Sequence, residues 1–333
     1  MNYIGSKYSL IDFLTETIMQ VVGADANNKV FADLFAGTGV VGKTFKEKGY
    51  RIIANDIQYY SYVLNKHLIE NIPPISINIV DDLNDLEGTE GFIYQNYCAG
   101  SGSGRQYFTD SNGKKCDSIR IELEHLKSRG EIDEAQYFYL LASLISSIDK
   151  FANTASVYGA FLKKIKKSAS KEFKLELLPI IDGNNGNKVY NDDISNLINQ
   201  VDGDILYLDP PYNSRQYCTN YHVLETIAKY DNPKLNGKTG LRDYSKQKSA
   251  FCSAKTVVET FDEVLRNAKF KYIFLSYNNE GLMPFEIIRK TMEQYGEYQQ
   301  FCTDHKRFKA DVDANRNYKS NSTIEYLHCL IKK

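Results

Sequence analysis

The chain has 333 residues, of which 42% are hydrophobic and 25% charged, and its formal net charge is −1. This is the composition of an ordinary globular protein, and no apolar run approaches the ~20 residues that a membrane-spanning helix requires. The six cysteines include no Cys-x-x-Cys pair and the five histidines no His-x-x-x-His pair, which argues against a disulfide framework or a catalytic metal. The N-terminus carries no signal peptide, so we expect a cytoplasmic protein without membrane association.

Strands and helices are predicted to alternate over the first 82 residues. After an initial helical pattern, short strands are expected at 30–35, 51–54 and 75–80, with helices to about residue 48 and over 60–71. This order favours a parallel sheet with right-handed crossovers. The alternation then stops and returns at about residue 188, with strands near 188–190, 204–208, 271–277 and 323–331 and helices near 193–199, 217–230, 254–268 and 283–295.

Residues 83–187 interrupt this pattern. They contain two glycine-rich loops, two helical stretches at roughly 118–129 and 131–151, and a lysine-rich segment that reaches about residue 174. We therefore expect a catalytic domain formed by 1–82 and 188–333, with a largely helical insertion at 83–187.

The sequence Asp209-Pro210-Pro211-Tyr212 follows the apolar run of 205–208. The prolines end the strand, which leaves a carboxylate and an aromatic ring at the sheet edge where α/β proteins bind ligands. The Asp209 carboxylate and the Pro210 carbonyl can each accept one hydrogen of an amino group, while Tyr212 stacks on its ring. This combination favours a flat substrate that carries an amino group.

A glycine loop spans 33–42 and includes Asp33, Gly37 and Gly39. Asp56 ends the next strand, at the place where dinucleotide-binding folds hold a ribose. The pattern Gly37-x-x-x-x-Gly42-Lys43-Thr44 also matches a phosphate-binding loop, so a P-loop NTPase is an alternative. However, the carboxylate of Asp33 beside the loop suits a cationic, nucleoside-like cofactor better than a triphosphate.

These motifs occur in an order that resembles the Dam-like, alpha-type class of DNA adenine-N6 methyltransferases. The segments that carry the resemblance are 2–7, the glycine loop, Asp56, 192–194 and 209–212. The segments 92–97, 152–154, 213–217 and 275–281 resemble the members that are partnered with type II restriction enzymes. The resemblance covers nearly the whole chain and implies a Rossmann-like S-adenosylmethionine-dependent methyltransferase fold.

The resemblance also implies roles for individual residues. Tyr3 and Lys7 would contact the methionine end of S-adenosylmethionine, with Lys7 pairing with its carboxylate. The cofactor loop would be lined by Asp33, Phe35, Gly37 and Gly39. Asp56 would hold the ribose of the cofactor. Asp193 and Ile194 would hold its adenine, with Asp192 as an alternative to Asp193. Asp209, Pro210 and Tyr212 would form the catalytic motif.

The implied reaction is methyl transfer from S-adenosylmethionine to the N6 amino group of an adenine flipped out of duplex DNA. RNA adenine methylation is a second alternative. We expect 83–187 to recognise the target, with the basic loop 232–250 as a second contributor, although a helical insertion also suits a dimer interface. The resemblance is also compatible with a cognate restriction endonuclease that acts on the same site, without implying direct contact between the two proteins, and it leaves monomer and dimer open.

Overall fold

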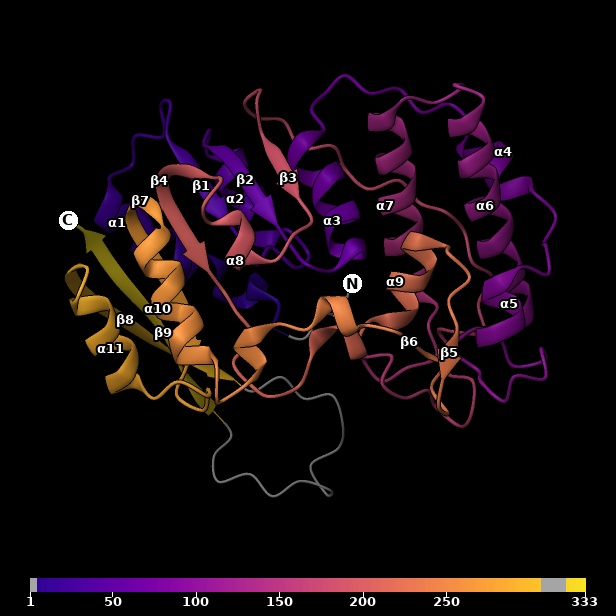
Figure 1. Cartoon of the computed structure of the whole chain (residues 1–333). Coiled ribbons are helices and arrows are strands. Elements are labelled where there is room, and N and C mark those ends of the chain that lie inside the picture. Colours follow the sequence, from indigo (N-terminus) through magenta and orange to yellow (C-terminus); the bar gives the residue numbers. More distant parts are fainter. Residues whose placement is uncertain (1–4, 307–321) are drawn as a thin grey trace.

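A seven-stranded sheet forms the centre of the computed structural model, which describes residues 5–306 and 322–333 (Figure 1). The strand order is β3-β2-β1-β4-β7-β9-β8; the first five of these strands run parallel, and β9 is antiparallel to both neighbours. In chain order they are β1 (Val30–Asp33), β2 (Arg51–Asn55), β3 (Lys188–Tyr190), β4 (Asp202–Leu208), β7 (Lys269–Asn278), β8 (Gly296–Lys306) and β9 (Ser322–Lys332). This doubly wound arrangement confirms the predicted Rossmann-like fold, and its switch point lies between β1 and β4.

Helices cover both faces of the sheet. One face carries α1 (Ile11–Val22) and α2 (Val40–Glu47), and the other carries α8 (Ile194–Leu197), α10 (Val257–Asn267) and α11 (Phe285–Glu293). The apolar run of β4 divides between the two faces, because Tyr207 packs with α1 and α2 while Leu208 packs with α10 and α11. Burial on both faces is why this strand has a continuous apolar sequence rather than an alternating one.

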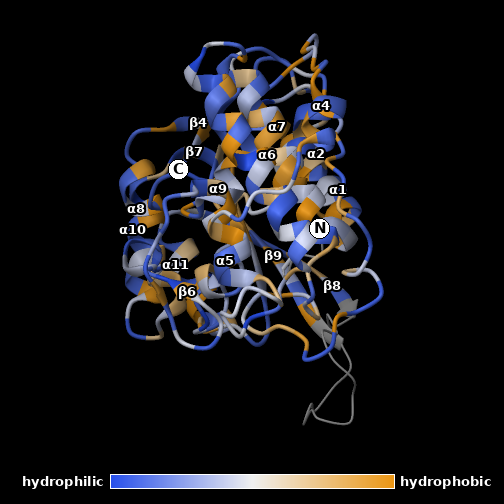
Figure 2. Ribbon diagram, turned by 90° about the vertical axis from the view of Figure 1, so that its right-hand side faces the viewer, coloured by the Kyte–Doolittle hydropathy of each residue, from blue (hydrophilic) through white to orange (hydrophobic). Residues whose placement is uncertain are grey.

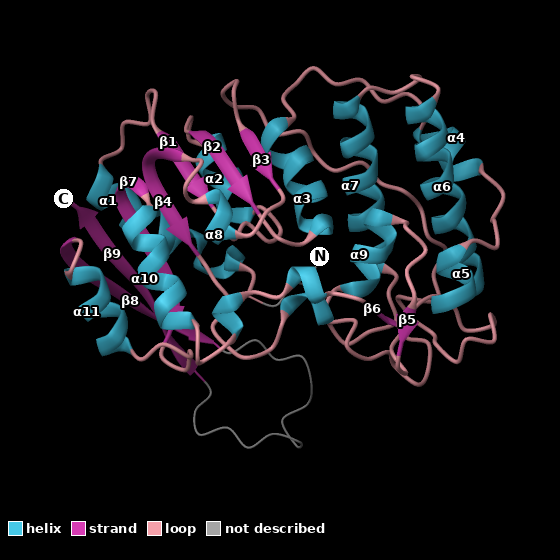
Figure 3. Cartoon of the chain, in the orientation of Figure 1, coloured by secondary structure: helices cyan, strands magenta, loops and turns pink. Residues whose placement is uncertain are grey.

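A helical region lies beside the β3 edge of the sheet (Figure 3). Its helices are α3 (Tyr59–Asn65), which continues as a π-helical turn over Lys66–Glu70, α4 (Val80–Asp85), α5 (Phe92–Tyr97), α6 (Asp110–Ser128), α7 (Glu134–Lys150) and α9 (His222–Lys229). They share one hydrophobic core, and apolar residues form bands along α6 and α7 in Figure 2. Within residues 5–306 and 322–333, no helix is both long and apolar enough to cross a membrane.

The inserted residues 83–187 do not form this core alone. Arg120 of α6 is buried and donates hydrogen bonds from Nε to the Ile227 carbonyl at 2.9 Å and from Nη2 to the Ala228 carbonyl at 3.0 Å. These carbonyls lie in the last turn of α9, where a helix has no partners of its own for them. The insertion and the segment that follows Tyr212 are therefore packed as one unit.

The strand predicted at 75–80 is absent. Residues 75–79 have no sheet partner, and Ile77 and Ile79 pack against the helical core. The sheet position beside β2 is filled instead by β3, which follows the insertion. Residues 75–79 do alternate between apolar and polar side chains, but their apolar side faces helices rather than the sheet. The sequence also predicted no strand at 296–306, where the structure has β8.

Short elements complete the chain between Tyr212 and α10. They are a 3-10 turn at Tyr217–Thr219, a two-stranded hairpin formed by β5 (Leu235–Asn236) and β6 (Leu241–Arg242), and 3-10 turns at Ser245–Gln247 and Ala250–Cys252. A further 3-10 turn, Lys7–Leu10, precedes α1.

Candidate active site

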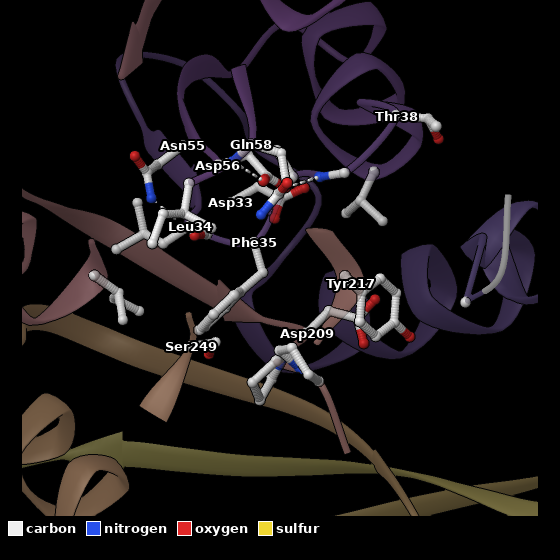
Figure 4. A pocket seen from close by; sticks show the side chains of 18 of the residues that line it. Asp33, Leu34, Phe35, Thr38, Asn55, Asp56, Gln58, Asp209, Tyr217 and Ser249 are labelled. Carbon is white, nitrogen blue, oxygen red and sulfur yellow. Dashed lines mark hydrogen bonds between the residues drawn. The ribbon is translucent and has the colours of Figure 1, made fainter. Parts of the chain in front are cut away.

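One cavity lies at the carboxyl edge of the parallel strands (Figure 4). An aspartate stands at or just after the end of each of four strands, namely Asp33 on β1, Asp56 after β2, Asp193 after β3 and Asp209 after β4. All four line the cavity, whose volume is about 980 Å³ when the open space at its mouth is counted.

Lys7 and Asp209 form a buried ion pair in the cavity. Lys7 Nζ lies 3.0 Å from Asp209 Oδ1, and their side chains are 7% and 17% exposed. Burial raises the pKa of Asp209 to about 6, although Lys7 opposes this shift. Burial also acts to lower the pKa of Lys7, but Asp209 and Glu325 of β9 outweigh it and the net shift is upward. At pH 7 the pair is therefore ionised, and Asp209 is a hydrogen-bond acceptor.

Pro210, Pro211 and Tyr212 continue the wall of the cavity beside Asp209. The Tyr212 hydroxyl is hydrogen-bonded to Tyr217, which also lines the cavity. Tyr217 lies against the N-terminal segment, because a Cβ atom on Gly5 would be only 3.0 Å from its hydroxyl. Two aromatic side chains that follow β4 thus stand on the Asp209 side of the cavity.

The glycine loop between β1 and α2 is held in a left-handed conformation. Gly37 and Gly39 have φ of 51° and 79°, a region that side chains other than glycine rarely enter. Gly37 donates from its N–H to Asp56 Oδ2 at 2.9 Å, and its carbonyl accepts from Asn65 Nδ2 at 3.0 Å. Gly39 does not line the cavity; a Cβ there would lie 2.8 Å from Asn65 Oδ1, so its role is to shape the turn.

Asp33 is the most perturbed carboxylate of the site. It is 1% exposed, and its Oδ1 is buried without a hydrogen-bond partner among the described residues. Burial, followed by the nearby charge of Asp209, raises the pKa of Asp33 to about 8. A negative charge here is costly because Asp33 is buried beside Asp209, and a cationic ligand would favour it.

Asp193 and Ile194 line the cavity at the start of α8. Asp193 Oδ1 accepts a hydrogen bond from the Ser195 N–H at 2.9 Å, which fixes the side chain. The neighbouring Asp192 is held by Asn55, whose Nδ2 donates to the Asp192 carbonyl at 3.1 Å and whose Oδ1 accepts from the Asp192 N–H at 3.0 Å. The end of β2 thus positions the loop that follows β3.

Several residues of the cavity have no strong signal in the sequence. Phe35 is not one of these, because the resemblance places it in the cofactor loop; it lines the cavity and packs edge-on against Phe251, with ring centroids 5.2 Å apart at 80°. Gln58 lines the cavity, is 3% exposed, and its Oε1 has no partner among the described residues. Only proximity in sequence, two positions after Asp56, could have pointed to it. Glu325 of β9 does not line the cavity, but its charge raises the pKa of both Lys7 and Asp209, and no local pattern marks it.

Other sequence-based candidates have different outcomes. Tyr3 lies outside the described residues. Cys218 is close to the motif in sequence but is not a candidate nucleophile, because burial raises the pKa of its thiol to about 12. Lys43 of the P-loop-like pattern pairs with Glu47, one turn along α2, at 3.7 Å, and the Thr44 hydroxyl donates to the Val40 carbonyl. Neither side chain is among those that line the cavity.

Several proteins are similar to this chain over almost its whole length. The type II methyltransferase M.NlaIII of Neisseria lactamica is 53% identical over 334 residues, which is 100% of this chain and 99% of that protein. M.CviAII of Paramecium bursaria Chlorella virus 1 is 38% identical, with 98% and 97% covered. M.FokI of Planomicrobium okeanokoites is 40% identical over 98% of this chain, which spans 55% of the relative.

Solved structures give a weaker result. Magnesium protoporphyrin IX methyltransferase of Synechocystis PCC 6803 aligns with 98% of this chain and 80% of its own, at 7% identity and a TM-score of 0.34, which is too low to carry a functional argument. By contrast, the family model of the D12 class N6 adenine-specific DNA methyltransferases matches residues 3–325. This chain belongs to the D12 class of N6 adenine-specific DNA methyltransferases.

Proposed function

We propose that the cavity holds S-adenosylmethionine on the side of Asp33, Asp56 and Asp193 and the target adenine on the side of Asp209 and Tyr212. The observation that carries this assignment is the convergence of four aspartates, each placed by a strand end, on one cavity. Membership of the N6 adenine-specific DNA methyltransferase family supports S-adenosylmethionine as the methyl donor, and it argues against the ATP-binding and RNA alternatives.

The residues present fit such a cofactor. Bound S-adenosylmethionine supplies an electrophilic methyl group on a sulfonium centre. Asp33, whose Oδ1 has no partner in the described chain, would offset a positive charge of the methionine end. Asp56 has one hydrogen bond to each carboxylate oxygen, from Gly37 N–H and Gln58 N–H at 2.9 and 2.8 Å, and each oxygen keeps a lone pair for a ribose hydroxyl. Phe35 and Ile194 would contact the cofactor's adenine, with Asp193 accepting from its amino group.

The target adenine would be held by two acceptors. Its amino nitrogen is a poor nucleophile because its lone pair is delocalised into the ring. Asp209 and the Pro210 carbonyl would each accept one amino hydrogen, which favours a more tetrahedral nitrogen whose lone pair is directed at the methyl group. Alignment and electrostatics supply most of the catalysis, and Asp209, with a pKa of about 6, can accept the proton that the methylated nitrogen releases.

Access to that nitrogen requires base flipping, because a duplex hides it within the stack. Tyr212 would replace the lost stacking, at ~1–3 kcal/mol for a base–aromatic contact. We further propose that the protein modifies a specific site in duplex DNA and protects host DNA from a cognate restriction endonuclease, as the names of M.NlaIII and M.FokI as type II methyltransferases suggest.

The inserted residues 83–187 are proposed to take part in target recognition. In the lysine-rich segment, Lys163, Lys164 and Lys167 are exposed and available for phosphates. Lys166 differs, because its Nζ donates to the Thr154 carbonyl at 2.8 Å. In the 232–250 loop, Arg242 is buried in a two-point ion pair with Asp231, so it is a structural residue rather than a phosphate contact.

The decisive experiment measures N6-methyladenine in DNA digested to nucleosides, from a host that lacks its own adenine methyltransferase. The control is Asp25→Ala, because Asp25 is exposed and precedes β1, at the opposite edge of the sheet. The intact protein and this control should both produce the modified base. The Asp209→Ala variant should produce none while retaining DNA binding. Normal methylation by Asp209→Ala would refute the assigned site, and no methylation by the intact protein would refute the function.

A further inference from the structure

The β5–β6 hairpin is an exposed element that requires support from outside itself. Its strands contain two residues each, pair Leu235 with Arg242 and Asn236 with Leu241, and are joined by the loop 237–240. A two-stranded hairpin of this size is at most marginally stable alone. Its shape must therefore come from contacts with the rest of the protein.

Side chains of the inserted region hold the loop through four consecutive carbonyls. Arg105 donates from Nη2 to the Gly237 carbonyl and from Nε to the Lys238 carbonyl, both at 3.1 Å. The buried Tyr97 hydroxyl donates to the Gly240 carbonyl at 2.9 Å. The buried Tyr107 hydroxyl, whose shorter contact is to Tyr158, lies 3.2 Å from the Thr239 carbonyl. Side chains of the insertion thus contact all four loop carbonyls and hold three of them by well-formed hydrogen bonds.

The loop backbone is also specified by its glycines. Gly237 and Gly240 have φ of 67° and 69°, and a Cβ on Gly240 would lie 2.8 Å from Arg105 Nε and 2.9 Å from Tyr97 Cε1. The base of the hairpin is closed by Arg242, whose two Nη atoms pair with the Asp231 carboxylate at 3.0 and 2.6 Å. Close packing at the tip and an ion pair at the base leave the hairpin little freedom.

The outer side of the hairpin carries hydrogen-bonding and cationic groups. Lys234, Asn236 and Lys238 are all exposed. In Figures 1 and 3 the hairpin lies at the lower end of α9, on the same lower side as the chain that follows β4. Five residues after Arg242, Gln247 lines the cavity and donates to Glu225 at 2.6 Å. A short, anchored segment therefore joins the hairpin to the wall of the active site.

We infer that the β5–β6 hairpin is a DNA-reading element, with Asn236 contacting a base edge beside the flipped adenine and Lys234 and Lys238 contacting phosphates. This inference rests on the proposed function. A two-stranded ribbon fits the major groove, and a carboxamide there reads bases by paired hydrogen bonds. The role of the inserted residues Tyr97, Arg105 and Tyr107 is then to hold the hairpin in a fixed position relative to the active site.

The phosphate contacts are tested by the salt dependence of binding. The methylated sequence is first identified by sequencing host DNA modified by the intact protein, and a duplex bearing it is titrated at several salt concentrations. Lys238→Ala and Lys234→Ala should each lower the slope of log affinity against log salt by about 0.9, the value for one phosphate contact. Lys290→Ala on α11, at the far end of the sheet, should keep the wild-type slope.

Base reading is tested by the same sequencing on DNA modified by Asn236→Ala. We expect increased methylation at sites that differ from the wild-type sequence at one position, with discrimination there reduced about tenfold or more. The inference is overturned if Asn236→Ala keeps the wild-type sequence preference and both lysine variants keep the wild-type salt slope. If the intact protein produces no N6-methyladenine at all, the proposed function fails instead, so the two failures are distinct.

Discussion

Lys7 Nζ lies 3.0 Å from Asp209 Oδ1 in a cavity that excludes most solvent from both groups. The resemblance to adenine methyltransferases implies that Lys7 pairs with the carboxylate of the cofactor, whereas in the structure its partner is the central residue of the Asp-Pro-Pro-Tyr motif. Burial alone would favour a protonated Asp209, whose O–H oxygen would act as a donor, so that Lys7 and an amino group would no longer each face an acceptor oxygen of a carboxylate. The lysine therefore preserves the acceptor that the reaction needs.

Activity should fall on acidification as Asp209 takes up a proton. Its pKa of about 6 predicts an acidic limb near pH 6 in kcat/KM, because protonation removes the negative charge and leaves only one of the two carboxyl oxygens as a full acceptor. Asp56 has a pKa near the same value, raised chiefly by burial. The Asp209→Asn variant distinguishes the two groups, since it keeps an acceptor that cannot titrate. Its activity should be low, and a limb that persists unchanged in this variant would belong to another group.

Replacing Lys7 should move that limb. Both the charge of Lys7 and its hydrogen bond lower the pKa of Asp209, so Lys7→Met should shift the acidic limb of kcat/KM to higher pH. Lys7→Arg, which keeps the charge, is the control and should leave the limb near its original position. If Lys7 instead serves mainly the cofactor carboxylate, Lys7→Met will raise KM for S-adenosylmethionine and leave the limb where it was.

Cofactor affinity should depend on the ionisation of Asp33. Its pKa of about 8, raised by burial and then by Asp209, means that a cationic ligand must expel a proton from Asp33 when it binds at pH 7. Affinity for S-adenosylmethionine should therefore increase as the pH rises through 8. Loss of this charged partner in Asp33→Asn should weaken binding by about ten- to a hundredfold.

Calorimetry in two buffers with different ionisation enthalpies measures the proton release directly. The amino group of the ligand also titrates near pH 8, so the difference between the intact protein and Asp33→Asn isolates the contribution of Asp33. Equal proton release by the two proteins would show that Asp33 does not change its ionisation on binding.

Local sequence signals predicted the part of the site that strand ends create. The apolar runs before Asp33, Asp56 and Asp209 are each buried strands, and parallel pairing brings their carboxyl ends to one edge. The two prolines after Asp209 end β4 at Leu208, as expected. These features depend on residues within a few positions of one another, so periodicity and turn chemistry describe them well.

Features that depend on distant packing were not predictable in this way. Whether an alternating apolar segment joins the sheet is decided by its partners, which is why 75–80 packs on helices while β3 takes its place. Gln58 lines the cavity, and Glu325 acts on its charged groups from outside, through tertiary placement alone. The insertion boundaries describe the chain order but not the packing, because the core of 83–187 is completed by α3 and α9.

Stability should depend strongly on the contact that joins the insertion to α9. Arg120→Ala removes two hydrogen bonds from a charged donor and leaves the buried Ile227 and Ala228 carbonyls unsatisfied. At ~1.5–3 kcal/mol for each such bond, we expect the free energy of unfolding to fall by about 3 kcal/mol or more. Thermal melting monitored by circular dichroism should show a drop of several degrees in Tm.

The control is Arg129→Ala at the end of the same helix, where exposed ion pairs to Glu122 and Glu131 are screened by solvent and contribute little. If both variants melt alike, Arg120 is not the residue that joins the insertion to the catalytic half of the chain.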